Sequence, residues 1–168
     1  AIGHSAANAS ETRNAINAGA SVVTHFNNAM AKLGAKDSLS QEALDSNIFL
    51  ELILDGQHVS ESDSVSIHSK ASDRIVAVTD AMSAAGCSDG QYKIGALEVT
   101  VENKVAKLSG TNTLAGSTLT MLDSFLNFKK LFGFEQAVKC TSLNPAKVLN
   151  LNPYSGYIAI KGREVTYL

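Results

Sequence analysis

Four histidine and aspartate side chains follow short apolar runs in this sequence, and these residue types can bind metal ions or transfer protons. His4 follows residues 1–3, His25 follows residues 21–24, His58 comes shortly after residues 48–54, and Asp80 follows residues 75–79. In parallel α/β folds the loops after the strands converge at one edge of the sheet, where functional sites are built. We therefore expect these four side chains to converge in one pocket.

The segments between the apolar runs have helical character. Residues 11–18 end on Gly19, a residue suited to the position just past a helix, and Asn8 or Ser10 can cap the start. A short helix is expected over residues 40–45, and Ser60 opens a capping-box pattern before a helix over residues 61–71. Strands that alternate with helices in this way predict a parallel sheet.

The alternation of strands and helices is interrupted between residues 81 and 116. Residues 92–101 and 104–108 alternate apolar and polar side chains around Glu102-Asn103, which predicts an inserted β-hairpin over about residues 91–109. Helical periodicity returns from Ser117 onward and stops at Gly133. Another helix is expected from Phe134, and Asn144-Pro145 predict the capped start of a last short helix.

Composition excludes several classes of partner. The 168 residues are 45% hydrophobic with a net charge of −2, which describes a globular domain or part of one. Charges are spread without runs, so neither nucleic acid nor a membrane surface is an expected partner. No apolar run approaches the roughly 20 residues of a transmembrane helix, and no signal-peptide pattern opens the chain, so we expect a cytoplasmic protein. Cys87 and Cys140 form no C-x-x-C motif and are expected to be reduced thiols.

Each candidate residue also has a plainer interpretation. His25 could be a hydrogen-bonded structural histidine, His58 a loop histidine, and Asp80 the cap of a turn. A carboxylate at the end of an apolar strand is costly unless it is paired, protonated or used, which favours a functional role for Asp80. His68 lies inside a predicted helix without a motif around it, and we expect a surface residue with no role.

Six short motifs together resemble the N-acetylglucosamine-6-phosphate deacetylase family of the amidohydrolase superfamily. In chain order they are Gly3-His4-Ser5, residues 24–30, Asp55-Gly56-Gln57-His58, residues 78–81, residues 114–121 and Leu143-Asn144-Pro145-Ala146-Lys147. Each motif alone is weak, but their order makes the set specific. The resemblance implies an α/β fold, namely a partial (β/α)8 TIM-type barrel with about the last four β/α units and the inserted hairpin.

The same resemblance divides the chain into two parts. Residues 1–150 match the C-terminal half of a metal-dependent barrel, and residues 151–168 match a remnant leading to a small β domain. A barrel of about 250 residues cannot close with four strands in this chain. We therefore expect the chain to be part of a longer enzyme.

The resemblance also implies a role for individual residues. His4 and His25 match the histidines that hold the family's divalent metal ion, for which zinc or iron suits imidazole nitrogens, and no organic cofactor is expected. Asp80 matches the catalytic aspartate. Four residues match substrate-binding positions: Asn28 and the amide of Ala29 in the phosphate-binding turn, His58 at the sugar phosphate, and Met121 around the acetamido group.

The activity implied is hydrolytic removal of the N-acetyl group from N-acetylglucosamine 6-phosphate, giving glucosamine 6-phosphate and acetate. A metal-activated water attacks the amide, and Asp80 serves first as general base and then as general acid. The expected partners are a small amino-sugar phosphate and a second copy of the chain in a dimer.

The sequence departs from the family pattern at several points. Asn27 stands where the family has phenylalanine, the C-terminus is short, and residues 33–39 lack the arginine that reaches a neighbouring subunit's phosphate. Lys36 could replace that arginine only as a point charge. The glutamate that completes the family's metal site belongs to an earlier strand, which this sequence does not contain. Two alternatives therefore stay open: a catalytically inactive sugar-phosphate-binding fragment, and a small doubly wound interaction module.

Overall fold

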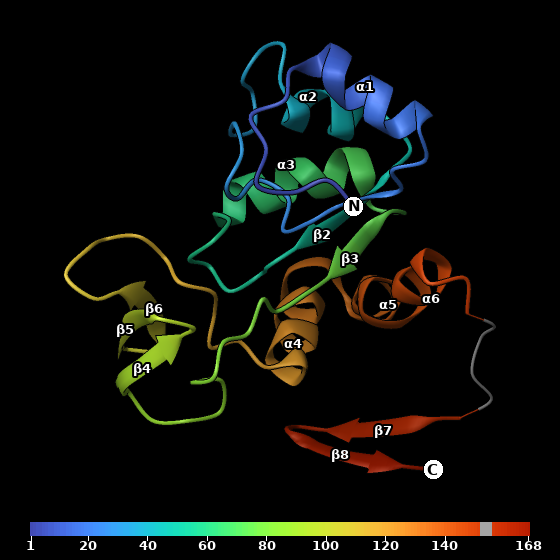
Figure 1. The fold of residues 1–168 in the computed structure, drawn as a ribbon. Helices are drawn as coiled ribbons and strands as arrows, with labels where there is room; N and C mark the ends of the chain where they lie inside the picture. The colour runs from blue at the N-terminus through green and yellow to red at the C-terminus, as the bar shows by residue number, and fades with distance from the viewer. Residues whose placement is uncertain (152–155) are drawn as a thin grey trace.

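A three-stranded parallel sheet lies at the centre of the computed structural model, which describes residues 1–151 and 156–168. Its order is β1 (Val22–Val23), β2 (Phe49–Leu52) and β3 (Ile75–Ala77). Figure 1 shows β2 and β3 side by side. Ile2 adds a parallel bridge to Val23 on the outer side of β1. The prediction of a parallel α/β arrangement is confirmed, although each strand is shorter than its apolar run.

A helix precedes each strand of this sheet, and a local cap determines where each helix begins. These helices are α1 (Ala9–Asn17), α2 (Leu39–Asp45) and α3 (Glu61–Ala71). Asn8 forms a capping box with Glu11, while Ser38 and Ser60 each accept a hydrogen bond from a first-turn N–H. Side-chain acceptors of this kind satisfy N–H groups that have no partner inside the helix. The predicted helices are therefore confirmed to within one or two residues.

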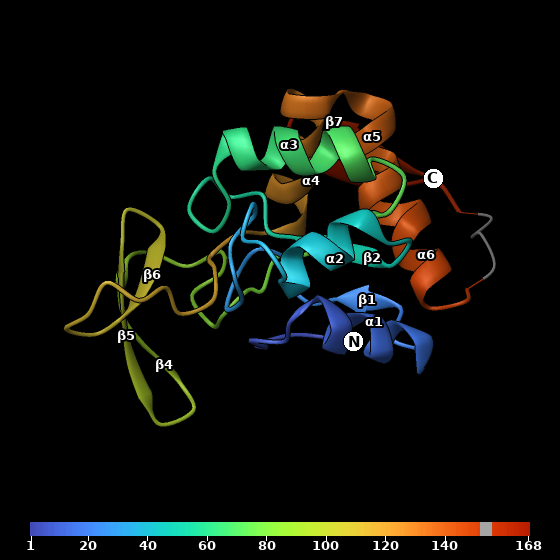
Figure 2. The same ribbon diagram turned by 90° about the horizontal axis from the view of Figure 1, so that it is seen from above.

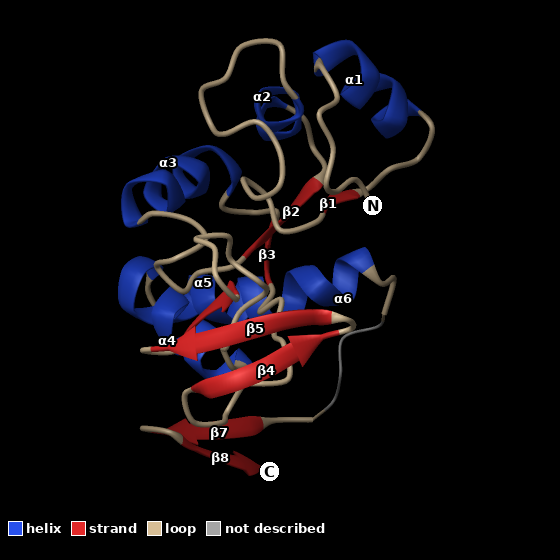
Figure 3. Ribbon diagram, turned by 60° about the vertical axis from the view of Figure 1, so that its left-hand side comes forward, coloured by secondary structure: helices blue, strands red, loops and turns tan. Residues whose placement is uncertain are grey.

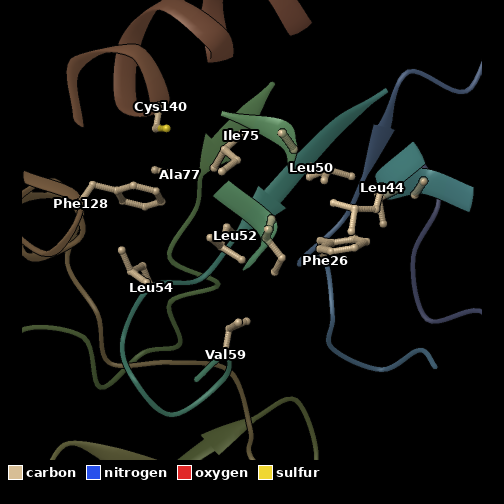
Figure 4. Close-up of a cluster of buried hydrophobic side chains, with 14 of the residues drawn as sticks. Phe26, Leu44, Leu50, Leu52, Leu54, Val59, Ile75, Ala77, Phe128 and Cys140 are labelled. Carbon is tan, nitrogen blue, oxygen red and sulfur yellow. The ribbon is translucent and has the colours of Figure 1, made fainter. Parts of the chain in front are cut away.

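The main core lies on one face of the parallel sheet. Alternate strand residues, among them Leu50, Leu52 and Ile75, pack with apolar side chains of α2, α3, α4 and α5. Figure 4 shows this cluster, with Phe128 of α4 at one side of it. The strand residues between them, including Glu51, point to the opposite face because successive side chains of a strand alternate. The helices therefore cover the face of the sheet that carries Leu50, Leu52 and Ile75.

The second half of the chain continues with helices. They are α4 (Met121–Phe132), α5 (Phe134–Val138), a π-helical turn (Lys139–Leu143) and α6 (Asn144–Val148). The predicted helical start at Ser117 is wrong, because Ser117 pairs with Ala81 as extended chain and Thr120 caps α4 instead. The predicted cap at Asn144 is also wrong. Asn144 is fully buried in a continuous helical stretch, and its side-chain amide donates to the backbone oxygen of Ile75 at 2.7 Å.

The inserted segment is a three-stranded antiparallel sheet rather than a single hairpin. It contains β4 (Gly90–Ile94), β5 (Leu97–Glu102) and β6 (Val105–Leu108). The predicted strand over residues 92–101 is wrong because Gly95, with a φ of 57°, turns the chain back after Ile94. Asn103 and Lys104 form the second turn with φ values of 50° and 62°, as in the tight turns favoured by hairpins. Figure 2 shows this sheet set apart from the helices.

The last described strands form a separate hairpin. Strands β7 (Ile158–Lys161) and β8 (Glu164–Tyr167) pair with each other and lie at one end of the molecule in Figure 3. They belong to the predicted tail over residues 151–168, of which residues 152–155 lie outside the described residues. Arg163 ties this hairpin to Asp123 in the first turn of α4. Within the described part of the chain, no helix combines the length and the hydropathy that crossing a membrane requires.

Candidate functional site

An uncommon backbone conformation marks three of the predicted site residues. His4, His25 and Asp80 have φ values of 48°, 32° and 49°, and each follows the carboxyl end of a parallel strand or bridge. Residues other than glycine seldom adopt a positive φ, and such strained positions cluster at functional sites. The strain therefore supports the sequence-based choice of these residues without assigning their roles.

His4 and His25 lie in contact. Their ring centroids are 4.7 Å apart with an angle of 73° between the planes. Gly3 makes this approach possible, because a Cβ atom there would lie 2.9 Å from Cβ of Thr24. The first segment can therefore close against β1 and place the two imidazoles side by side.

The His25 ring has a buried nitrogen with no hydrogen-bond partner among the described residues. His25 is 7% exposed, and its Nδ1 atom is the unpaired one. An unsatisfied buried polar atom costs free energy, so a ligand at this position would relieve that cost. Two neighbouring imidazoles fit a divalent metal ion chemically. Within the described residues no group of three histidine, cysteine or acidic side chains is placed to hold one, so the pair supplies part of a ligand set.

The turn after His25 is held by hydrogen bonds inside the turn. Asn27 is 1% exposed, and its side-chain oxygen accepts a hydrogen bond from the backbone N–H of Leu33 at 2.7 Å. Asn27 therefore anchors the following loop. Asn28 is half-buried, Ala29 is exposed with a φ of 49°, and Lys36 is exposed.

His58 is paired with Asp55 in the loop after β2. The His58 Nδ1 atom lies 2.7 Å from Oδ2 of Asp55, while Oδ1 accepts hydrogen bonds from the backbone N–H groups of Gln57 and His58. Burial alone would raise the pKa of Asp55, but these hydrogen bonds outweigh it and lower the pKa below its ordinary value. The pairing leaves Nε2 as the ring nitrogen that a ligand could contact.

Asp80 is exposed at the end of β3, where the segment before α4 closes against it. Its backbone oxygen accepts the N–H of Ser117 at 2.8 Å. Gly116 is needed for this contact, because a Cβ atom there would lie 2.9 Å from the same oxygen. Asp80, Met82, Lys93 and Gly116 line a cavity of about 380 Å³.

The structure brings together some of the predicted site residues but not all. His4 touches His25, whereas no hydrogen bond or ion pair within residues 1–151 and 156–168 joins Asp80 or His58 to either of them. Met121 is 46% exposed as the first residue of α4. His68 is half-buried and stacked on Phe132 at 4.1 Å, so the expectation of a surface residue is wrong.

Two acidic residues beside the site were not assigned a role from sequence. Asp55 was recognised only as part of a motif, and Glu51 only as part of an apolar run. The Glu51 carboxylate accepts a hydrogen bond from the backbone N–H of His25 at 3.3 Å. The sequence did contain a sign that Glu51 has a specific role, because Glu51 is the one charged residue in a strand that is otherwise apolar.

Known proteins resemble the chain closely. An N-acetylgalactosamine-6-phosphate deacetylase from Escherichia coli O157:H7 is 36% identical over 159 residues, which cover 92% of this chain and 42% of that protein. The N-acetylglucosamine-6-phosphate deacetylase of Bos taurus is 33% identical over 164 residues, covering 92% of this chain and 40% of the relative. This chain is a homologue of the N-acetylglucosamine-6-phosphate deacetylases. No protein-family model matches it.

Solved N-acetylglucosamine-6-phosphate deacetylases share the fold. The enzyme from Mycobacterium smegmatis superimposes with a TM-score of 0.91 at 31% identity, covering 99% of this chain and 49% of that structure. The enzyme from Thermotoga maritima gives a TM-score of 0.85 at 31% identity, covering 97% of this chain and 51% of the solved one. The chain thus spans 40% to 42% of the length of these two curated relatives and about half of the solved structures.

Proposed function

We propose that this chain is part of an enzyme that removes the N-acetyl group from N-acetylglucosamine 6-phosphate, giving glucosamine 6-phosphate and acetate. The observation that carries the proposal is the contact between His4 and His25 at the carboxyl ends of parallel segments, in a homologue of these deacetylases. Because the chain spans less than half of its curated relatives, the activity is proposed for the whole protein.

The chemistry is divided between an ion and a carboxylate. His4 and His25 would hold a divalent cation, and zinc or iron suits these imidazole donors; when bound, it would polarise the amide carbonyl and acidify the attacking water. Asp80 accepts the proton of the attacking water on its carboxylate and then donates it to the amine nitrogen that leaves. Its exposure at the end of β3 supports this role, because a catalytic carboxylate must be reachable by substrate.

The remaining residues position the sugar. Asn28, the Ala29 amide and His58 hold the 6-phosphate, and Met121 lies against the acetamido group. Asp55 supports His58 in this role by holding its other ring nitrogen at 2.7 Å. Binding a phosphate away from the scissile bond lowers the barrier by orienting the amide.

For the whole protein we propose a (β/α)8 barrel that assembles as a dimer. The parallel segments from Ile2 to β3 would form part of its wall. Helices cover one face of the sheet, which supports this proposal. In a barrel, helices pack against the outer face of the strands, while the interior is filled by side chains of the strands. A doubly wound interaction module requires helices on both faces, which the core cluster does not favour.

The test is replacement of Asp80 by asparagine in the natural full-length protein. We expect turnover of N-acetylglucosamine 6-phosphate to fall by at least about 10²-fold, since general acid-base groups contribute about 10² to 10⁴ in rate. Sugar-phosphate affinity should stay within about tenfold, because the asparagine amide keeps the size of the side chain. Asp45→Asn, which changes an exposed carboxylate at the end of α2, is the matched control and should leave turnover unchanged.

Assays with both N-acetylglucosamine 6-phosphate and N-acetylgalactosamine 6-phosphate define the substrate, because relatives bear each name. Turnover of the Asp80→Asn protein within a few-fold of the parent would refute the acid-base assignment. The alternative of a catalytically inactive sugar-phosphate-binding fragment predicts that the 168-residue chain by itself binds the sugar phosphate saturably but does not hydrolyse it.

A further inference from the structure

Glu51 is the only charged residue within strands β1 to β3. Its neighbours Leu50 and Leu52 are fully buried in the core, whereas Glu51 is half-buried on the opposite face and pairs in register with Val76 of β3. A carboxylate in such a strand loses hydration, and this cost is tolerated when the group makes specific hydrogen bonds. The hydrogen bonds that Glu51 makes therefore indicate its structural role.

Two successive backbone N–H groups at the end of β1 are bound by Glu51. Its carboxylate Oε2 accepts the N–H of His25 at 3.3 Å, and its backbone oxygen accepts the N–H of Phe26 at 2.6 Å. These contacts act at the point where His25 adopts a φ of 32°. A left-handed conformation is unfavourable for a residue other than glycine and persists only when its surroundings enforce it.

We propose that Glu51 is a positioning residue that holds the His25 peptide in its left-handed conformation and so fixes the imidazole beside His4 for metal binding. Without Oε2, the N–H of His25 loses its acceptor, and the peptide is free to rotate toward the extended conformation of β1. The imidazole would then move with its backbone. Glu51 is not itself a third ligand in this arrangement, since no cluster of three ligating side chains occurs in the described ranges 1–151 and 156–168. This inference rests on the metal site of the proposed function.

The experiment measures Co²⁺ binding to the natural full-length protein in the absence of substrate. Affinity is measured by competition with a chromophoric chelator, and the visible d–d absorption of bound Co²⁺ reports the ligand geometry. Glu51→Met keeps most of the side-chain volume but removes the acceptor, and it should weaken Co²⁺ binding by about 10- to 100-fold and change the spectrum. Glu51→Gln keeps an oxygen acceptor and should restore affinity to within about threefold of the parent on the same scale.

Val76→Ala is the matched control, because Val76 is the partner of Glu51 on β3 and lies on the same face of the sheet. This variant should keep the parent's affinity and spectrum. Glu51→Ala provides a second acceptor-free variant if Glu51→Met does not fold, which circular dichroism checks. Unchanged Co²⁺ binding in the acceptor-free variants would overturn the inference, as would an equal loss in Val76→Ala or in Glu51→Gln.

Failure of this inference is distinguishable from failure of the proposed function. Co²⁺ binding that depends on Glu51, in a protein that hydrolyses neither acetylated sugar phosphate, would refute only the deacetylase proposal. Deacetylation that proceeds with Co²⁺ affinity independent of Glu51 would refute only the positioning role. A full-length protein that binds no Co²⁺ would refute the inference as well.

Discussion

At the scale of single residues, Asp55 shows how one carboxylate can organise a loop. It receives hydrogen bonds from two backbone N–H groups and contacts the His58 ring, and its side chain is 13% exposed. Hydrogen bonds to a charged acceptor contribute more than those to a neutral one. The loop after β2 therefore depends on the ionised form of Asp55.

The lowered pKa of Asp55 predicts a specific loss of stability in acid. A carboxyl group with a lower pKa in the folded protein stabilises the fold fully above its unfolded pKa of about 3.9, and this stabilisation is lost as the pH falls through the folded value. Asp55→Asn should lower the free energy of unfolding by about 1–3 kcal/mol at pH 7. We expect this difference between parent and variant to shrink on going from pH 5 toward pH 2. Urea unfolding at several pH values measures it, and a difference that grows in acid would contradict the assignment.

At the scale of elements, Arg74, the residue before β3, binds the chain at the end of α2. Its guanidinium group donates to the backbone oxygens of Ala43, Leu44 and Ile48, which follow the last turn of that helix or lie within it. Burial lowers the pKa of Arg74, while nearby Asp45 partly opposes this shift. Carbonyl groups at a helix end lack partners within the helix, so Arg74 supplies the donors that α2 needs.

We predict that Arg74→Met destabilises the protein by about 1.5–3 kcal/mol, because several carbonyl oxygens lose a charged donor. The control is Arg13→Met. Arg13 pairs with Glu42 on the surface, where an exposed ion pair contributes about 0.2–1 kcal/mol. Chemical unfolding of both variants tests the difference. An equal loss of unfolding free energy in the two variants would contradict the prediction, because Arg74 would then contribute no more than a surface ion pair.

At the scale of the whole molecule, the β7–β8 hairpin exposes an apolar face. Ile158 and Tyr167 are cross-strand partners and are 56% and 86% exposed. Val165 lies on the same face of β8 as Tyr167 and is 44% exposed. Adjacent apolar side chains with this exposure favour association, because burying them removes apolar surface from water.

We therefore expect the 168-residue chain to associate in a concentration-dependent way. Tyr167→Lys should weaken association by at least about tenfold, since burying one large apolar side chain contributes about 1.5–3 kcal/mol. Thr166→Lys adds the same charge on the other face of the hairpin and should have little effect. Light scattering over a range of concentrations measures the mass of each protein. A mass that stays monomeric throughout for the parent chain would contradict the prediction.

Much of the local structure followed from the sequence alone, because its causes lie within a few residues. The caps at Asn8 and Ser60 act on N–H groups three positions away, so the starts of α1 and α3 could be predicted from residue type and spacing. The cap of α2 at Ser38 was not recognised from the sequence. The alternation of apolar runs with helical segments likewise indicated the parallel sheet. Errors of prediction arose where a local pattern had two solutions, as at Gly95, which ends one strand of the inserted sheet and starts the next.

The site depended on contacts between residues far apart in the chain, which only the tertiary structure decides. The sequence by itself identified His4, His25 and Asp80, because each follows an apolar run. It did not show that Gly3 lets His4 approach His25, that Gly116 closes against Asp80, or that Glu51 binds the peptide of His25. These contacts join positions separated by some twenty to thirty-six residues, and their existence depends on how neighbouring strands align. Residue types therefore set which chemistry is available, whereas the register of the sheet decides which of those residues meet.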